Sequence, residues 1–304
     1  MGTTWSVRLD AARDADLRVL HVGIEAQLAL VVAQMSTWEP NSDISRFNRS
    51  EAGHWQQIPL EFSQVLTCAL EIAAASDGAF DPTIGTLVAA WGFGPHAHRE
   101  APDAAALDHA RERTGWQRLA FDANYRLLQP GGLQLDLSAI AKGFAADRVA
   151  THLCSAGIPG ALVEVGGELV GYGRKADGTA WHVLVEAGPE EEDHALEPRV
   201  LALDGIAVAS SGDRWHHHTR GGRRCTHTID PRSGEPVMYA PVAVTVVAGD
   251  AMHADAWATA LSVLGVEAGH TLAQRLGLAA RFLWREGNAL EECMSDPFRI
   301  HLAA

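Results

Sequence analysis

Apolar side chains recur at helical spacing along the first half of the chain. In residues 14–36 they fall three or four positions apart, which predicts a helix with one apolar face: Leu17, Leu20, Ile24, Leu28 and Val31. Similar stretches predict helices over 61–76 and 102–114. Further along, a short strand ending at Asp136 leads into a predicted helix of about 138–155.

The second half alternates apolar and polar residues in the manner of strands. The stretches are "ALVEVGG", "ELVGYG", "WHVLVEAG", "LALDGIAVASSG", "HTIDP" and "VAVTVVAG". Helices at about 253–264 and 267–276 precede a final strand, "RFLWREG". Because helices and strands are grouped rather than alternating, we expect an α+β fold with a mixed or antiparallel sheet flanked by helices. No long linker interrupts the chain, so a single domain over residues 1–304 is expected.

Composition and charge limit the classes of binding partner and the cellular compartment that we expect. The formal net charge of −14 argues against a nucleic-acid surface, although a few local donors could still hold a small anion. No apolar run reaches the roughly 18–20 residues that cross a bilayer, so no transmembrane segment is expected. The start, Met1–Ser6, has no basic or apolar signal region, which predicts a cytoplasmic protein as the sequence stands. The 4 cysteines show no C-x-x-C pair, so reduced thiols are expected rather than a zinc site or disulfides.

The segment "HADAWATALSVLG", residues 253–265, offers hard oxygen ligands. Asp255 and Thr259 are four positions apart, so on a helix they lie on the same face near its N-terminus. A carboxylate and a hydroxyl suit Mg²⁺ or Ca²⁺ better than zinc. Taken alone, the pattern equally fits an aspartate that offsets the helix dipole beside a tolerated threonine.

The segment "LDLSAIAKGFAAD", residues 135–147, suggests a phosphate site. Ser138 is a plausible N-cap, and Lys142 lies in the first turns of the predicted helix. Free N–H groups at a helix start together with one ammonium can hold a phosphate, and Asp136 could accept hydrogen bonds from a ligand. The alternative is a capped helix with a surface lysine.

Paired glycines and two tryptophans add less specific signals. Gly166-Gly167 follows an apolar strand, and such a pair serves either close ligand approach or a hairpin turn. Trp38 and Trp91 could stack on an aromatic ligand or lie in the core. The chain has no G-x-S-x-G, Walker loop or strand–G-x-G-x-x-G–helix, so serine hydrolases, P-loop enzymes and Rossmann dehydrogenases are not favoured.

The order of these motifs is more specific than any one of them. From residue 1 to 265 they run "MGTTWSV", "MSTWEPNSDISRFN", "DGAFDPTIGTLVAAWGFGP", "LDLSAIAKGFAADRVA", "ALVEVGGELVGYG", "AVASSGD", "HTIDPRSGEPV" and "ADAWATALSVLG". In this arrangement the chain resembles the FAD:protein FMN transferase family, often called the ApbE family, over nearly its whole length.

The resemblance implies a Mg²⁺-dependent enzyme that splits the FAD pyrophosphate. Such an enzyme transfers FMN to a threonine hydroxyl of an acceptor flavoprotein, in a small-residue context such as Asp-Gly-x-x-Thr, and releases AMP. Positions implied to contact FAD are Met1, Trp38, Ala79, Phe80, Asp81, Asp136, Lys142 and Ile229. The implied metal ligands are the backbone oxygen of Ala139 and the side chains of Asp255 and Thr259.

His227 matches the family histidine implicated in activating the acceptor. An imidazole has a suitable unperturbed pKa for a general base. The turn within "TIDPRSGEPV", residues 228–237, is expected to fix the strand end that presents His227.

Two departures from the family pattern stand out. Many relatives are exported lipoproteins, whereas here the first motif begins at Met1, so we expect either a cytoplasmic protein or one whose leader is missing from the given sequence. Some relatives carry an acidic residue just before the metal threonine, where this chain has Ala258. The number of metal ions is therefore open, as is the choice between a transferase, an FAD pyrophosphatase and a non-catalytic flavin-binding protein.

Overall fold

The chain forms two compact units in the computed structural model. The model describes residues 2–12, 15–95, 102–185, 196, 199–212, 217–220, 223–226, 228–238, 241–287 and 289–303. Unit 1 comprises Met1, Leu30–Ala141 and His216–Met238, and unit 2 comprises Gly2–Ala29, Lys142–Trp215 and Tyr239–Ala304. The single domain expected over residues 1–304 stays a prediction.

An antiparallel sheet forms the centre of unit 2. Within the described ranges it is seven-stranded, in the order β1-β5-β6-β9-β14-β15-β16. The strands are β1 (Trp5–Asp10), β5 (Gly160–Val165), β6 (Glu168–Tyr172), β9 (Ile206–Ser211), β14 (Ala243–Ala248), β15 (Ala279–Glu286) and β16 (Ala289–Met294). With helices packed on it, this sheet confirms the α+β prediction.

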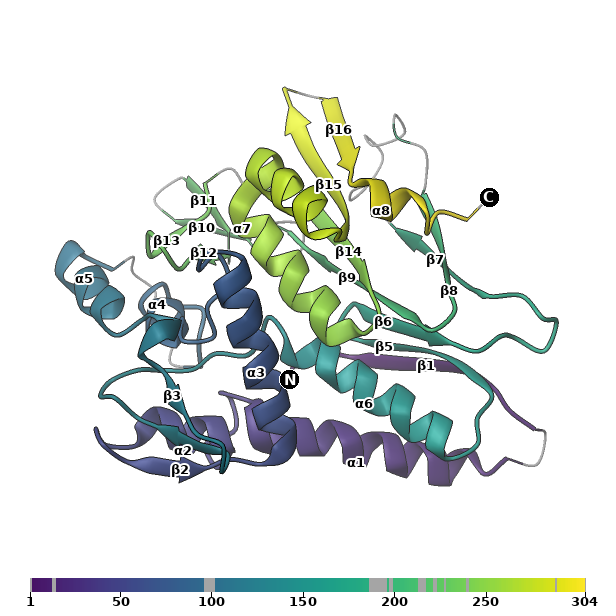
Figure 1. Ribbon diagram of the computed structural model, residues 1–304, viewed down its shortest axis with the longest axis horizontal. Helices are drawn as coiled ribbons and strands as arrows, with labels where there is room; N and C mark the ends of the chain where they lie inside the picture. The colour runs from purple at the N-terminus through teal and green to yellow at the C-terminus, as the bar shows by residue number, and fades with distance from the viewer. Residues whose placement is uncertain are drawn as a thin grey trace. The chain divides into compact units, whose positions relative to one another are not determined.

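Both faces of the sheet are covered. One face packs against the antiparallel pair β7 (Trp181–Val185) and β8 (Arg199–Leu203) and the short helix α8 (Asp296–Arg299). The long helix α7 (Ala251–Leu276) lies along β9 and β14, as Figure 1 shows. Strands buried on two sides can be apolar almost throughout, which explains the near-continuous apolar run of β14.

Helix α7 contains both predicted C-terminal helices. Asp250 caps its start by accepting a hydrogen bond from the backbone N–H of His253 at 2.8 Å. The helix bends at Gly265, which has φ 77°, and ends at Gly277 in the left-handed conformation. The two predicted segments therefore join at a glycine that no other residue could replace without strain.

Both edge strands of the sheet were missing from the sequence prediction. "RFLWREG" was expected as the last strand, but β16 follows it and pairs along β15. At the other edge, β1 pairs with β5. Edge strands carry charged residues and short apolar runs, so their alternation stands out less in a single sequence.

Unit 1 is made mainly of helices and short strands. Its helical elements are α2 (Asp43–Arg49), α3 (Leu60–Ala75), α4 (Gly85–Ala90), α5 (Ala104–Glu112) and the 3₁₀ turn Trp116–Arg118. Its strands are β2 (Trp55–Gln57), β3 (Ala120–Phe121), β4 (Arg126–Leu128), β10 (His217–Arg220), β11 (Arg223–Thr226), β12 (Ile229–Asp230) and β13 (Glu235–Pro236). The predicted helices over 61–76 and 102–114 correspond to α3 and α5.

The strand predicted to end at Asp136 does not form. Only an isolated parallel bridge joins Gln134 to Ile84. The following helix, α6 (Ala141–Ser155), begins three residues later than predicted, so Ser138 is not its N-cap. Instead the Ser138 backbone N–H donates to Asp136 Oδ1 at 2.8 Å, which shapes a turn ahead of the helix.

Helix α1 (Leu17–Met35) confirms the first helical prediction and adds a feature that the sequence reading did not anticipate. By length and composition it meets the criterion for a membrane span, and it alone does so among the described residues. Soluble core helices and secretion signals meet the same criterion.

Of the predicted reduced thiols, Cys68, Cys154 and Cys293 are free, but Cys154 is exposed rather than in the core.

Candidate active site

A lysine between two buried carboxylates lies near the starts of α6 and α7 in unit 2. Lys142 Nζ is hydrogen-bonded to Glu168 at the start of β6 and lies 3.4 Å from Asp255 Oδ1. Asp255 is 5% exposed and Glu168 is 2% exposed. Asp255 Oδ2 also accepts a hydrogen bond from the Gly143 backbone N–H at 3.1 Å. Buried carboxylates need such partners, and here one ammonium serves both.

Two glycines make this arrangement sterically possible. A Cβ on Gly143 would lie 2.1 Å from the Ala251 carbonyl oxygen, so only glycine lets the start of α6 approach the start of α7. Gly166, at φ 63°, turns the hairpin between β5 and β6, and its missing Cβ would lie 3.0 Å from Lys142 Cδ. The Gly166-Gly167 pair is therefore a hairpin turn, one of the two predicted alternatives, and it also makes room for the lysine; close approach of a ligand stays a prediction.

The donor set around Asp255 suits a hard cation. Thr259 lies one turn further along α7, in a stretch with regular helical geometry, and is partly exposed. Asp255 already lies beside one cation, the Lys142 ammonium. Carboxylate and hydroxyl oxygens are the ligands that Mg²⁺ prefers. No group of three His, Cys, Asp or Glu side chains among the described residues could hold a metal. Ala258 is a buried apolar residue, so a cation here would rely largely on neutral oxygens and ligand phosphates.

Asp81 organises a loop of unit 1. Its Oδ1 accepts hydrogen bonds from the Thr83 N–H at 2.7 Å and the Thr83 hydroxyl at 2.6 Å, and its Oδ2 accepts the Trp116 N–H at 3.1 Å. Burial raises the pKa of this carboxyl, and the hydrogen bonds from Thr83 and Trp116 oppose the rise. The neighbouring Ala79 and Phe80 are buried too, so any ligand contact there would be through the backbone or after a local opening.

Asp136 and Ala139 lie in the turn that precedes α6. The Asp136 N–H donates to the Pro82 carbonyl at 2.9 Å, which joins this turn to the Asp81 loop inside unit 1. Asp136 is partly exposed, with one carboxylate oxygen bonded to Ser138. Its other oxygen has no hydrogen bond among the described residues and is available for a ligand.

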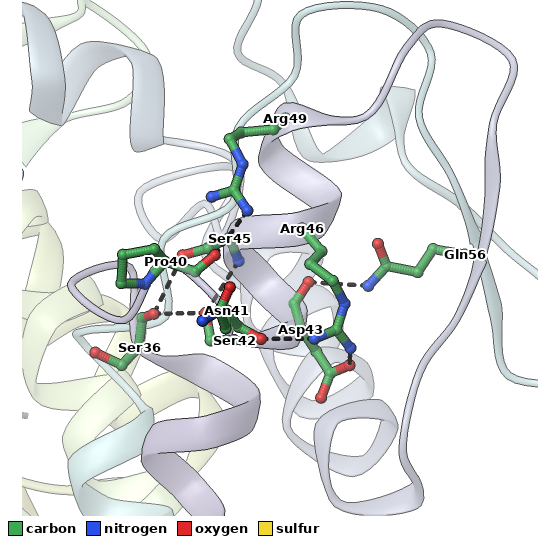
Figure 2. Close-up of polar contacts among 9 residues, drawn as sticks. All are labelled: Ser36, Pro40, Asn41, Ser42, Asp43, Ser45, Arg46, Arg49 and Gln56. Atoms are coloured by element: carbon green, nitrogen blue, oxygen red, sulfur yellow. Dashed lines mark hydrogen bonds and ion pairs between the residues drawn. The ribbon is translucent and has the colours of Figure 1, made fainter.

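Trp38 lies on a loop between α1 and α2 that polar contacts hold in place. Figure 2 shows the Ser42 hydroxyl donating to the Ser36 carbonyl, at 2.7 Å, while Ser42 caps α2. Arg49 donates to the Pro40 carbonyl at 2.6 Å. Trp38 itself is 65% exposed. A pinned loop that leaves an indole largely in solvent is consistent with a stacking role and excludes the alternative of a core tryptophan.

The turn of "TIDPRSGEPV" is braced from two helices of unit 1. Trp91, just after α4, donates from Nε1 to the Gly234 carbonyl at 2.8 Å, and Arg111 of α5 donates from Nε to the Ser233 carbonyl at 2.7 Å. Ile229 is buried in the cluster with Leu87 beside these contacts. The turn is therefore firmly held by these contacts. His227 and Met1 lie outside the described residues, so their predicted roles stay predictions.

Sequence reasoning missed two acidic residues of unit 2. Glu168 pairs with Lys142, and its signal was the polar residue that directly follows the Gly166-Gly167 turn. Asp147, on α6, accepts hydrogen bonds from the Ala251 and Met252 N–H groups. Its signal was its place within the "KGFAAD" motif, one to two turns after Lys142.

Fold and site together define a class of protein: an α+β chain in which a lysine at a helix start lies between two buried carboxylates, suited to a phosphate-bearing ligand and a cation. The chain belongs to the ApbE family, which it matches over residues 1–282.

Relatives and solved structures agree with that membership. A Salmonella typhimurium protein named FAD:protein FMN transferase is 35% identical over 312 residues, covering 100% of this chain and 88% of the relative. The apo structure of the flavinyl transferase ApbE from Pseudomonas stutzeri superposes with a TM-score of 0.91 at 38% identity, covering 100% of this chain and 95% of the other. The flavin transferase ApbE from Vibrio cholerae gives a TM-score of 0.90 at 33% identity, covering 99% and 96%.

Proposed function

We propose that this protein transfers FMN from FAD to a threonine hydroxyl of an acceptor flavoprotein and releases AMP. The observation that carries the proposal is Lys142 at the start of α6, hydrogen-bonded to the buried Glu168 and beside the buried Asp255. A helix start with an ammonium favours a phosphate, and a buried carboxylate one turn from a hydroxyl favours a cation. Full-length relatives named for FAD:protein FMN transfer support the same activity.

The chemistry is a phosphoryl-type substitution. The threonine oxygen forms a bond to the phosphorus of the FMN half, the pyrophosphate P–O bond breaks, and AMP leaves with the bridging oxygen. The threonine loses its proton in the process, and His227 is the proposed acceptor of that proton. Because such reactions depend mostly on positioning and charge stabilisation, the protein's task is to hold the pyrophosphate and orient the hydroxyl.

Asp255 and Thr259, with the backbone oxygen of Ala139, are the proposed ligands of Mg²⁺. When bound, this ion would neutralise charge on the pyrophosphate. Lys142 is the residue proposed to hold a phosphate oxygen. In the described contacts its ammonium is engaged by Glu168 and Asp255, so phosphate binding would exchange one of these partners for a ligand oxygen.

The other proposed FAD contacts belong to unit 1, apart from Lys142. Trp38 offers an exposed indole for stacking on a ring, and Asp136 offers a partly exposed carboxylate oxygen. Ala79, Phe80, Asp81 and Ile229 are buried, which suits residues that shape a binding wall more than residues that reach into it. Met1 completes the set proposed from the family resemblance.

The acceptor is proposed to be a flavin-bearing redox protein that presents a threonine among small residues, such as Asp-Gly-x-x-Thr. Small neighbours would let the hydroxyl approach a phosphorus held by the enzyme. Neither nucleic acid nor membrane lipid is part of the proposed reaction. The protein is proposed to act in the cytoplasm in the form given by its sequence, or outside it as a lipoprotein if a leader precedes this chain.

The test is in-gel flavin fluorescence of a candidate acceptor after incubation with the protein and FAD. We expect a fluorescent acceptor band that survives denaturation, requires Mg²⁺, and disappears when the acceptor threonine is replaced by alanine. Mg²⁺-dependent release of FMN and AMP without a fluorescent acceptor would instead identify an FAD pyrophosphatase, and bound but unchanged FAD would identify a flavin-binding protein.

A further inference from the structure

The starts of α6 and α7 hold each other through a reciprocal pair of carboxylates. Asp255 of α7 accepts the Gly143 N–H at the start of α6, at 3.1 Å. In return, Asp147 of α6 accepts the first two N–H groups of α7, from Ala251 at 2.8 Å and from Met252 at 2.9 Å. Each helix start therefore receives an acidic side chain from the other helix, where the helix dipole favours a negative charge.

Each of the first four N–H groups of α7 has a hydrogen-bond acceptor. The His253 N–H donates to the Asp250 side chain at 2.8 Å, and the Ala254 N–H donates to the Asp250 carbonyl at 3.3 Å. The Ala251 and Met252 N–H groups have Asp147 as their partner. Removing Asp147 would therefore leave two N–H groups unpaired at a partly buried helix start.

The starts of α6 and α7 are in close backbone contact. A Cβ at Gly143 would lie 2.1 Å from the Ala251 oxygen and 2.8 Å from the Met252 nitrogen, so the first turn of α7 lies directly against the backbone of α6. Asp255 follows Ala251 by one helical turn. A shift of that first turn would move the Asp255 carboxylate relative to Gly143 and Lys142.

We propose that Asp147 is a positioning residue for the cation site: by holding the first turn of α7 against α6, it fixes where the Asp255 carboxylate lies. The inference rests on the proposed role of Asp255 as a metal ligand. Asp147 itself touches neither the proposed ligand oxygens nor the phosphate-binding lysine. Its effect passes through the helix backbone, in the way that outer partners orient metal ligands.

The test compares Asp147→Asn and Asp147→Ala with the parent by two measurements. The first is amide-resolved hydrogen exchange on the metal-free protein, with the Gly143 N–H as the reporter. Asp147 does not touch this N–H, but Asp255 does, so its exchange reports on the position of Asp255. We expect it to exchange about tenfold faster in both variants.

The second measurement is Mn²⁺ binding by electron paramagnetic resonance, which needs no turnover. We expect the dissociation constant for Mn²⁺ to rise about 10- to 100-fold in both Asp147 variants. Asp103→Ala is the matched control, because Asp103 also caps a helix start, by accepting the Ala106 N–H at 2.8 Å on α5. That control should leave both the Gly143 exchange rate and Mn²⁺ affinity as in the parent.

Unchanged Gly143 exchange together with parent-like Mn²⁺ affinity in Asp147→Asn would overturn the inference, whatever the loss of thermal stability. Asp255→Ala separates the inference from the proposed function. If Asp255→Ala binds Mn²⁺ as the parent does, the metal assignment fails, while faster Gly143 exchange in Asp147→Asn still supports Asp147 as the residue that fixes Asp255.

Discussion

Single residues at the two helix starts of unit 2 carry the proposed cation and phosphate sites. Asp255 is almost completely buried, yet it faces an ammonium and a backbone N–H rather than apolar groups. Keeping a carboxylate there is costly unless something cationic balances it. The lysine does so in the described contacts, and under the proposed function a divalent ion would do so too. The spacing of Asp255 and Thr259 and the place of Lys142 in the first turns of a predicted helix are local patterns, so the sequence could suggest them as candidates, and their roles stay predictions.

The first prediction concerns Asp255→Ala. Without its one carboxylate, the proposed Mg²⁺ site keeps only neutral oxygens, so transfer at ordinary Mg²⁺ should fall by about 10²-fold or more. FAD binding should weaken less, because contacts with the rings and the adenine are retained. Initial rates of acceptor flavinylation, with FAD affinity measured alongside, check this. A near-parental rate would show that Asp255 does not hold the catalytic ion.

The second prediction concerns His227→Ala. Loss of the proposed base should lower kcat by about 10²- to 10⁴-fold with little change in FAD affinity. In the parent, the rate should rise with pH through the titration of the histidine, because only neutral imidazole accepts a proton. A variant that melts much lower and also loses FAD would make His227 a support of the braced turn and not the base.

At the scale of elements, the contact between α6 and α7 makes the free energy of unfolding depend on pH. Burial raises the pKa of Asp147 to about 7, the Asp250 carboxylate also raises it, and the Ala251 and Met252 N–H groups and His253 oppose the rise. A carboxyl with a raised folded-state pKa binds its proton more tightly in the folded than in the unfolded chain. Its stabilising contribution is therefore complete below the unfolded pKa of 3.8 and is lost as pH rises through about 7.

The third prediction follows from the direction of this pKa shift. The free energy of unfolding of the parent, relative to Asp147→Asn, should decrease between about pH 4 and pH 7 and then level off. Denaturant unfolding of both proteins across this range measures it. Asp103→Asn serves as the control for the loss of a helix-capping carboxylate elsewhere in the chain. A parent-to-Asp147→Asn difference that rises with pH would contradict the raised pKa.

Elements with strong periodicity were predictable, and those fixed by distant partners were not. The apolar spacing of α1 and α3 and the short apolar, strand-forming runs of β5, β9 and β14 indicated their positions to within a few residues. The edge strands β1 and β16 depend on partners far along the chain, so their local signal is small. The contact of Asp147 with Ala251 and that of Asp255 with Gly143 join residues 104 and 112 positions apart, through helix packing that no local pattern encodes.

At the scale of the whole molecule, the chain is an α+β protein of the ApbE family made of two compact units. The fold class was predictable because strands and helices are grouped along the sequence. The division into two units was not, because unit 1 and unit 2 are each assembled from separated segments. The order of motifs along the chain carried more functional information than any single motif.

The fourth prediction concerns ligand preference. With Mg²⁺ present, the protein should bind FAD more tightly than FMN or riboflavin, because Lys142 and the ion act on the pyrophosphate that only FAD carries. Fluorescence-quenching titrations with the three flavins measure this, and Lys142→Ala should narrow the differences. Equal affinities for FAD and riboflavin in the parent would mean that the pyrophosphate is not recognised.

The measurement that tests the central claim most directly is the intact mass of an acceptor protein after reaction, with the AMP released counted in the same sample. The acceptor carries a threonine in an Asp-Gly-x-x-Thr context, and the reaction contains FAD and Mg²⁺. FMN transfer predicts a mass increase of one FMN moiety per acceptor, lost in the threonine-to-alanine acceptor, with one AMP formed for each adduct. AMP and free FMN forming in equal amounts while the acceptor mass stays unchanged would contradict it.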